Sequence, residues 1–201
     1  HAHPETAFEE HRTSAIVAEK LESFGIDVHQ GLAGTGVVGT ISTGDGPMIG
    51  LRADMDALHI NELNNFNHKS THDGKMHACG HDGHTTMLLG AARYLAETKR
   101  FKGTVRFIFQ PAEENEGGGR KMVEEGLFEQ FPVDQVFGMH NWPGMPLGEM
   151  AMTAGPQMAA VDRFTITVKG KGFHGAMPNL GVDAVLTASE IVVALQSICA
   201  R

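Results

Sequence analysis

One short segment combines several side chains that bind transition metals. Residues 77–84 read His-Ala-Cys-Gly-His-Asp-Gly-His, which places imidazole, thiol and carboxylate groups close together in the chain. Cys79 and His81 are two positions apart, so a tightly turned backbone can direct both toward one point, and thiolate and neutral imidazole are good zinc ligands. A histidine-rich surface loop is the alternative. We favour a metal site, because a single cysteine lies among the histidines that run from His68 to His84.

Two adjacent glutamates form a second candidate group. Glu113 and Glu114 follow a predicted strand, and on a turn two neighbouring carboxylates can face one site. One of them can bind a metal, while the other stays free and takes a proton from a water whose pKa the metal lowers. A solvated acidic loop is the alternative, since Glu116 is nearby. The place of the pair at the end of a strand, beside Pro111, favours a functional role.

Two further histidines stand apart from these groups. His140 ends an apolar strand pattern, where a lone histidine is more often a structural residue than a ligand. With Cys79, His81 and Glu114 as candidate partners, we interpret His140 as a ligand. His174 lies in a glycine-rich loop, and its immediate surroundings alone assign it no role.

The elements that carry these groups alternate between helix and strand patterns. Helical periodicity covers residues 7–24, 85–98, 120–125 and 183–198, and extended patterns cover 31–46 as a hairpin and 48–53, 104–109 and 133–139 as strands. Strands that alternate with helices imply a parallel sheet, whose functional groups gather at the carboxyl ends of the strands. Asp54, Glu113 and His140 lie at or just beyond three such ends. We therefore expect them to meet at one edge of the sheet.

The character of the chain changes near residues 156–162. Residues 162–169 alternate between polar and apolar side chains, which predicts a half-exposed strand, and the helix predicted over 183–198 follows. This pattern suggests the first part of a second, small α+β domain.

The composition of the chain indicates which binding partners and which cellular compartment to expect. The 16 basic and 24 acidic residues give a formal net charge of −8, which argues against nucleic acid. No apolar run approaches the roughly 18 residues of a membrane span, so we expect no membrane partner. Cys79 and Cys199 are too few for a disulfide framework and favour a reducing compartment, the cytoplasm. Because the chain begins at His1 rather than Met, and ends in a helical pattern, we expect both ends to continue in a longer protein.

Four motifs, in order, resemble those of the metal-dependent amidohydrolases of the aminoacylase/carboxypeptidase superfamily. They are residues 52–58, 76–84, 110–114 and 138–140, and the opening residues 1–5 match as well. The most similar branch holds hippurate hydrolases, N-acyl-amino-acid amidohydrolases and plant auxin-conjugate hydrolases. The resemblance covers essentially the whole chain.

The resemblance implies a fold and a metal site. The fold is α/β, with a mixed, mainly parallel central sheet flanked by helices, as in zinc exopeptidases. Residues 1–157 would form the N-terminal part of the catalytic domain, and residues 158–201 the beginning of an inserted lid or dimerisation domain. The site would hold divalent metal, two ions of zinc, manganese, cobalt or nickel, through the ligands Cys79, His81, Glu114 and His140.

The resemblance also implies an activity. Glu113 would be the general base, and His174 would help to bind the substrate and to stabilise the transition state, often at a partner subunit's site. The reaction is hydrolysis of the amide bond of a small N-acyl amino acid by a homodimer or homotetramer. A metallo-carboxypeptidase or dipeptidase with the same centre is one alternative, and a metal-binding but inactive fragment is another. The chain departs from the family pattern at His59, where relatives usually have Pro, and it ends before a further metal-binding histidine that relatives carry.

Overall fold

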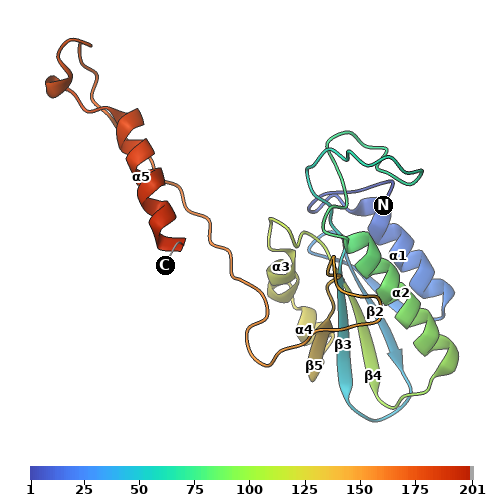
Figure 1. Ribbon diagram of the computed structural model, residues 1–201. Coiled ribbons are helices and arrows are strands. Elements are labelled where there is room, and N and C mark those ends of the chain that lie inside the picture. The colour runs from blue at the N-terminus through green and yellow to red at the C-terminus, as the bar shows by residue number, and fades with distance from the viewer. Residues whose placement is uncertain (200–201) are drawn as a thin grey trace. The chain divides into compact units, whose positions relative to one another are not determined.

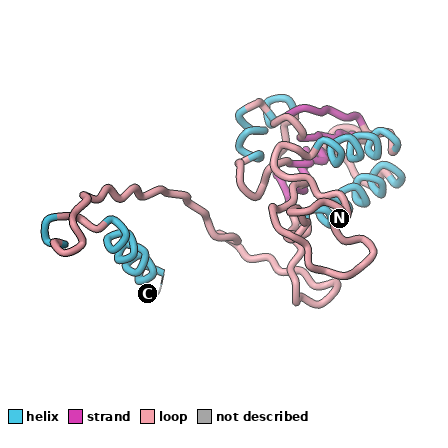
Figure 2. The backbone as a smooth tube through the Cα atoms, turned by 90° about the horizontal axis from the view of Figure 1, so that it is seen from above, coloured by secondary structure: helices cyan, strands magenta, loops and turns pink. Residues whose placement is uncertain are grey.

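The computed structural model describes residues 1–199 and divides into two compact units, His1–Met145 and Pro146–Arg201. In the first, helices pack on a central sheet, as two views at right angles show (Figures 1 and 2). The domain boundary that we predicted between residues 157 and 158 stays a prediction.

The first unit is built on a five-stranded sheet in the order β1-β2-β4-β3-β5. The strands are β1 (Asp27–Leu32), β2 (Gly36–Ser42), β3 (Met48–Asp54), β4 (Thr104–Gln110) and β5 (Gln135–Gly138). β3 is parallel to both β4 and β5, whereas β2 is antiparallel to β1 and β4. This mixed sheet with its flanking helices confirms the predicted α/β class. β1 and β2 form a hairpin, but it spans residues 27–42 rather than the predicted 31–46.

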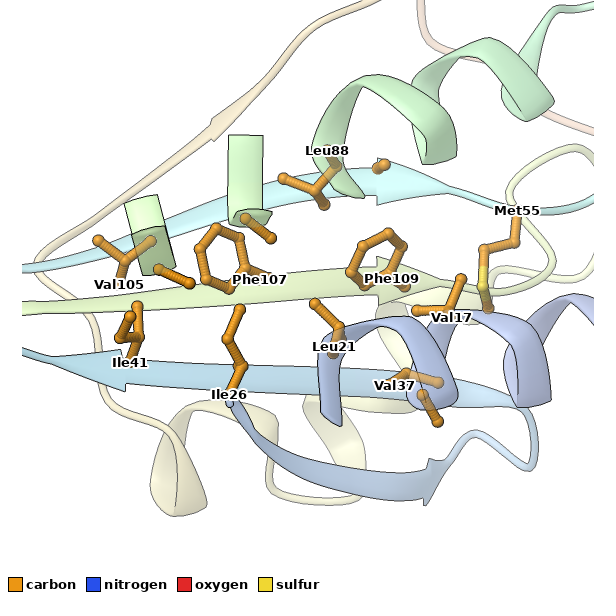
Figure 3. Close-up of a cluster of buried hydrophobic side chains, with 14 residues drawn as sticks. Val17, Leu21, Ile26, Val37, Ile41, Met55, Leu88, Val105, Phe107 and Phe109 are labelled. Atoms are coloured by element: carbon orange, nitrogen blue, oxygen red, sulfur yellow. The ribbon is translucent and has the colours of Figure 1, made fainter. Parts of the chain in front are cut away.

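Two helices cover one face of the sheet and bury its main core. They are α1 (His11–Ser23) and α2 (His81–Thr98). Leu21 of α1 and Leu88 of α2 pack against Phe107 and Phe109 of β4, as Figure 3 shows. Both phenylalanines are fully buried, and burying each contributes about 1.5–3 kcal/mol. This core fixes α2 over the sheet and so fixes where the first turn of α2 lies.

The opposite face of the sheet is covered by two short helices, α3 (Gly118–Glu124) and α4 (Leu127–Gln130). Met122 and Leu127 pack there against Val38 and Ile108. The sequence predicted a single helix over residues 120–125 and did not predict α4. β4 therefore has helices packed on both of its faces.

Two helices begin at different residues from those predicted. α1 begins at His11 rather than near residue 7, since Phe8 has a left-handed φ of 59° and the Glu5 carboxylate accepts from the amides of Arg12 and Thr13 at 2.9 and 2.7 Å. α2 begins at His81 rather than residue 85, directly after Gly80, whose φ is 85°. The second half of the histidine cluster therefore lies in the first helical turn and not in a loop.

The second unit contains a short 3-10 turn, Pro178–Leu180, and the helix α5 (Ala184–Cys199), which confirms the helix predicted over 183–198. Asp183 caps α5, because its carboxylate accepts from the amide of Val185 at 2.9 Å. The strand predicted over residues 162–169 is wrong, since these residues belong to no strand. Alternation makes a segment suitable for a sheet, but a strand also needs a neighbouring backbone to pair with, and within residues 146–199 none pairs with this segment. In the part of the chain that the structure describes, no helix is both long and apolar enough to cross a membrane.

Candidate metal centre

The candidate residues of the first unit meet at the carboxyl ends of its parallel strands. The register pairs Asp54 of β3 with Gln110 of β4, and Arg52 of β3 with Gly138 of β5, so these three strands end side by side. The segments that follow carry the candidates, and the first turn of α2 reaches the same edge. Sequence periodicity therefore predicted correctly that these residues meet at one edge of the sheet.

The five candidates of this unit form two overlapping groups of possible ligands. Cys79, His81 and His140 make one group, and His81, Glu113 and Glu114 make the other, with the ligand atoms of each group within 4.8 Å of one another. Cys79 Sγ lies 3.4 Å from His140 Nε2. His81 Nε2 lies 3.7 Å from Glu114 Oε1 and 3.9 Å from Glu113 Oε2. His81 is thus the common member. The sixth candidate, His174, belongs to the second unit.

Two buried atoms of this cluster lack hydrogen-bond partners, and they are the test of whether a metal fits. His81 Nε2 and Glu114 Oε1 are both buried without a partner in the described chain. An unpaired buried polar atom is unfavourable. Two ligand atoms bound to one zinc ion at a tetrahedral angle lie about 3.4 Å apart, given metal–ligand distances of about 2.1 Å. The observed 3.7 Å is close to that value, so one divalent cation would satisfy both atoms.

The charges around the cluster also fit a cation. Burial, together with the nearby carboxylates of Glu114, Glu113 and Asp54, raises the pKa of the Cys79 thiol to about 12. A thiolate there needs a compensating positive charge, which a divalent ion supplies. Cys79 is a free cysteine, as predicted.

Asp56 orients two of the candidate ligands through hydrogen bonds. His81 Nδ1 lies 3.2 Å from Asp56 Oδ1, and the amide of Glu114 donates to Asp56 Oδ2 at 3.0 Å. A carboxylate only accepts, so Nδ1 carries a proton, and Nε2 faces the site, where its lone pair can bind a cation when the imidazole is neutral. Burial raises the pKa of Asp56, but the hydrogen bonds from His81 and from the backbone of Glu114 and Glu113 outweigh burial and leave the pKa below its usual value.

A second buried carboxylate connects the site to the segment after β5. Asp54 Oδ1 lies 2.6 Å from His84 Nδ1, and His84 Nε2 accepts from the amide of Asn141 at 2.9 Å. Arg52 donates to the other Asp54 oxygen at 2.7 Å. Burial raises the pKa of Asp54, but His84 and Arg52 bring it down to about 2. This chain of contacts fixes the backbone next to His140.

The two adjacent glutamates differ in exposure. The Glu113 side chain is 42% exposed and that of Glu114 is 18% exposed. Burial raises the pKa of Glu113, and the charge of Glu114 raises it further. A carboxyl group with a raised pKa that reaches solvent suits proton transfer, and the inner one suits metal binding.

Sequence reasoning did not assign roles to Asp54, Asp56 or His84. The available signal was the position of the two aspartates at the end of a buried strand and of His84 one helical turn after His81. Gly80 has a steric role as well, because a Cβ there would lie 2.6 Å from the Asn141 side chain.

Comparison with known protein families agrees with this arrangement. Residues 50–199 match the peptidase family M20/M25/M40. The chain belongs to this family. That confirms the resemblance seen in the motifs, and the match includes Cys79, Glu113 and His140.

The curated relatives of the M20 chain include several amidohydrolases. It is 48% identical to a hippurate hydrolase of Campylobacter jejuni over 100% of this chain and 52% of the relative. It is 46% identical to an N-acetylcysteine deacetylase of Bacillus subtilis, over 100% of this chain and 53% of that protein. An N-acyl-L-amino acid amidohydrolase of Geobacillus stearothermophilus is 43% identical, over 100% of this chain and 55% of its own length. The chain thus spans about half the length of these relatives.

Solved structures agree with the fold. A dinuclear metal-binding peptidase of the M20 family from Bacillus subtilis is 46% identical, with a TM-score of 0.70 over 74% of this chain and 42% of that chain. A putative aminohydrolase from methicillin-resistant Staphylococcus aureus is 36% identical, with a TM-score of 0.81 over 100% of this chain and 54% of that chain.

Proposed function

We propose that this chain forms part of a metal-dependent amidohydrolase that splits N-acyl amino acids into a carboxylic acid and a free amino acid. The observation that supports this most is the pair of buried, unpartnered atoms, His81 Nε2 and Glu114 Oε1, within an acidic cluster that also holds a thiol. The substrate class comes from the relatives, which are named hippurate hydrolase, N-acetylcysteine deacetylase and N-acyl-L-amino acid amidohydrolase.

The proposed ligands are Cys79, His81, Glu114 and His140, with two divalent ions of zinc, manganese, cobalt or nickel. A bound ion would lower the pKa of a water and polarise the acyl carbonyl group. Asp56 holds His81 and the backbone of Glu114 in place, so these ligands are preorganised.

Glu113 is the proposed general base. It takes one proton from the attacking water, whose oxygen bonds to the acyl carbon, and it delivers that proton to the amide nitrogen as the carbon–nitrogen bond breaks. Its carboxyl group is free for this role, because in the described chain no hydrogen bond to another side chain holds it, and its pKa is raised above the usual value, the direction that suits a general base.

The remaining assignments concern the substrate and the assembly. His174 is proposed to bind the substrate and to stabilise the transition state. A homodimer or homotetramer is proposed from the family resemblance. The cytoplasm is proposed as the compartment, because Cys79 is a free thiol among candidate metal ligands.

The test is a combined metal and substrate assay on the complete protein that contains this chain. The apo protein is titrated with Zn²⁺, Mn²⁺, Co²⁺ or Ni²⁺ and assayed on hippurate, N-acetyl amino acids and dipeptides, with Glu113→Gln as the matched inactive control. Metal-dependent release of the amino acid from hippurate or N-acetyl substrates is expected. Cleavage of dipeptides alone would make it a dipeptidase or carboxypeptidase, and metal binding without any turnover would make this chain a metal-binding module only.

A further inference from the structure

Glu10 is a fully buried carboxylate outside the cluster described above. Its Oε1 accepts from the backbone amide of Ala112 at 2.9 Å, and its Oε2 accepts from the Thr35 hydroxyl at 2.7 Å. Both donors are neutral groups, so neither offsets the charge of the carboxylate. Burying a charged group without an opposite charge is unfavourable, and its hydrogen bonds offset that cost only in part.

The residue that Glu10 binds has an unusual backbone. Ala112 has a φ of 51°, in the left-handed region that residues with a Cβ rarely adopt. It lies directly before Glu113 and Glu114, so its conformation sets the direction in which the chain leaves β4. Its amide is buried, and a buried amide needs an acceptor. Glu10 supplies that acceptor from a position far away in the sequence.

The turn after β4 is therefore held at two points. Glu10 binds it at Ala112, and Asp56 binds it at the amide of Glu114. The Ala112 carbonyl also accepts from the amide of Gly118 at 3.0 Å, which closes the turn before α3. If the contact with Glu10 were lost, Ala112 would return to a negative φ. That change would redirect both glutamates.

We infer that Glu10 is a positioning residue for the metal centre, whose carboxylate holds Ala112 in its left-handed conformation and so aims Glu113 and Glu114 at the site. This inference rests on the proposed metal site. Glu10 contacts neither metal nor substrate and acts only through the turn.

The experiment compares four variants with the wild-type chain: Glu10→Ala, Glu10→Gln, Ala112→Gly, and Glu10→Ala combined with Ala112→Gly. Zinc affinity is measured by competition with a chromophoric chelator. Backbone hydrogen exchange of residues 112–114 is measured in the metal-free chain. Val105→Ala is the control for general destabilisation, because Val105 is buried at the opposite end of β4.

Glu10→Ala is expected to weaken zinc binding by about 10–100-fold, as is usual for residues that orient ligands, and to speed exchange at residues 112–114. Glu10→Gln should keep most of the affinity, because the amide oxygen still accepts from Ala112. Glycine adopts positive φ freely, so Ala112→Gly should restore affinity to the Glu10→Ala chain. Val105→Ala should lower the melting temperature and leave zinc affinity unchanged.

Several results would overturn the inference. Glu10→Ala with wild-type affinity and wild-type exchange would do so, and so would a loss of affinity that Ala112→Gly does not restore, or faster exchange spread over the whole unit. If Glu10→Ala does not fold, the same decision rests on Glu10→Met, which fills a similar volume but offers no acceptor oxygen, with and without Ala112→Gly. If the wild-type chain binds no zinc, the proposed metal site fails by itself, and hydrogen exchange at residues 112–114 still decides the role of Glu10.

Discussion

Replacing Asp56 by asparagine tests how the ligands are oriented, because the two side chains have the same shape. The Asp56 carboxylate accepts from two donors, His81 Nδ1 and the amide of Glu114. Asparagine offers one acceptor oxygen, and its NH₂ group would face the second donor. One charge-assisted hydrogen bond is therefore lost, at about 1.5–3 kcal/mol.

If losing this hydrogen bond leaves the ligands less well oriented for the metal, Asp56→Asn should weaken zinc affinity by about 10–100-fold. Chelator competition measures the affinity, and thermal unfolding of the metal-free chain shows whether the fold is retained. Asp27→Asn is the matched control, because it removes the same charge from an exposed residue of the edge strand β1 and should leave zinc affinity unchanged. A folded Asp56→Asn chain that binds zinc as tightly as the wild type would refute the argument that Asp56 orients His81 and Glu114.

Three further outcomes are expected. In the complete enzyme, Glu113→Gln should keep its metal and lose about 10²–10⁴-fold in kcat, whereas Glu114→Gln should lose metal affinity. Metal analysis with steady-state kinetics checks both variants, and the reverse pattern would exchange the roles of the two glutamates. In the full-length enzyme, His174→Ala should lower kcat without changing metal content, and a loss of metal would show that His174 is misassigned. Because the pKa of Asp54 is lowered to about 2, Asp54 stabilises the fold above the pKa of an unfolded Asp, about 4, and this contribution is lost as the pH falls toward 2. Acid unfolding of the metal-free Asp54→Asn chain should therefore be less steep between pH 4 and 2, and an unchanged profile would contradict the shift.

Much of the site could be predicted from the sequence because it lies where strands end. The hydrophobic patterns before Asp54, Glu113 and His140 indicated three strands, and parallel strands bring their carboxyl ends to one edge. The chemistry of the motifs then predicted which side chains would meet there. The structure brings Cys79, His81, Glu113, Glu114 and His140 together at that edge, as expected.

The parts that could not be predicted depend on contacts between distant residues. Nothing in the sequence near Glu10 indicates that its side chain reaches the amide of Ala112, because that contact exists only once α1 has packed against the sheet. The early start of α2 depends on the left-handed Gly80, a backbone feature that composition does not specify. Residues 162–169 show the opposite error, since their alternation suits a strand but the described part of the second unit gives them no partner.

X-ray absorption at the zinc edge of the zinc-loaded chain tests the proposed metal centre most directly, because it reports which atoms bind the ion. We predict one sulfur neighbour at about 2.3 Å together with nitrogen and oxygen neighbours at about 2.0–2.2 Å, and loss of the sulfur neighbour in Cys79→Ser but not in Cys199→Ser. A zinc ion bound by nitrogen and oxygen alone in the wild-type chain, or a sulfur neighbour that persists in Cys79→Ser, would contradict the account.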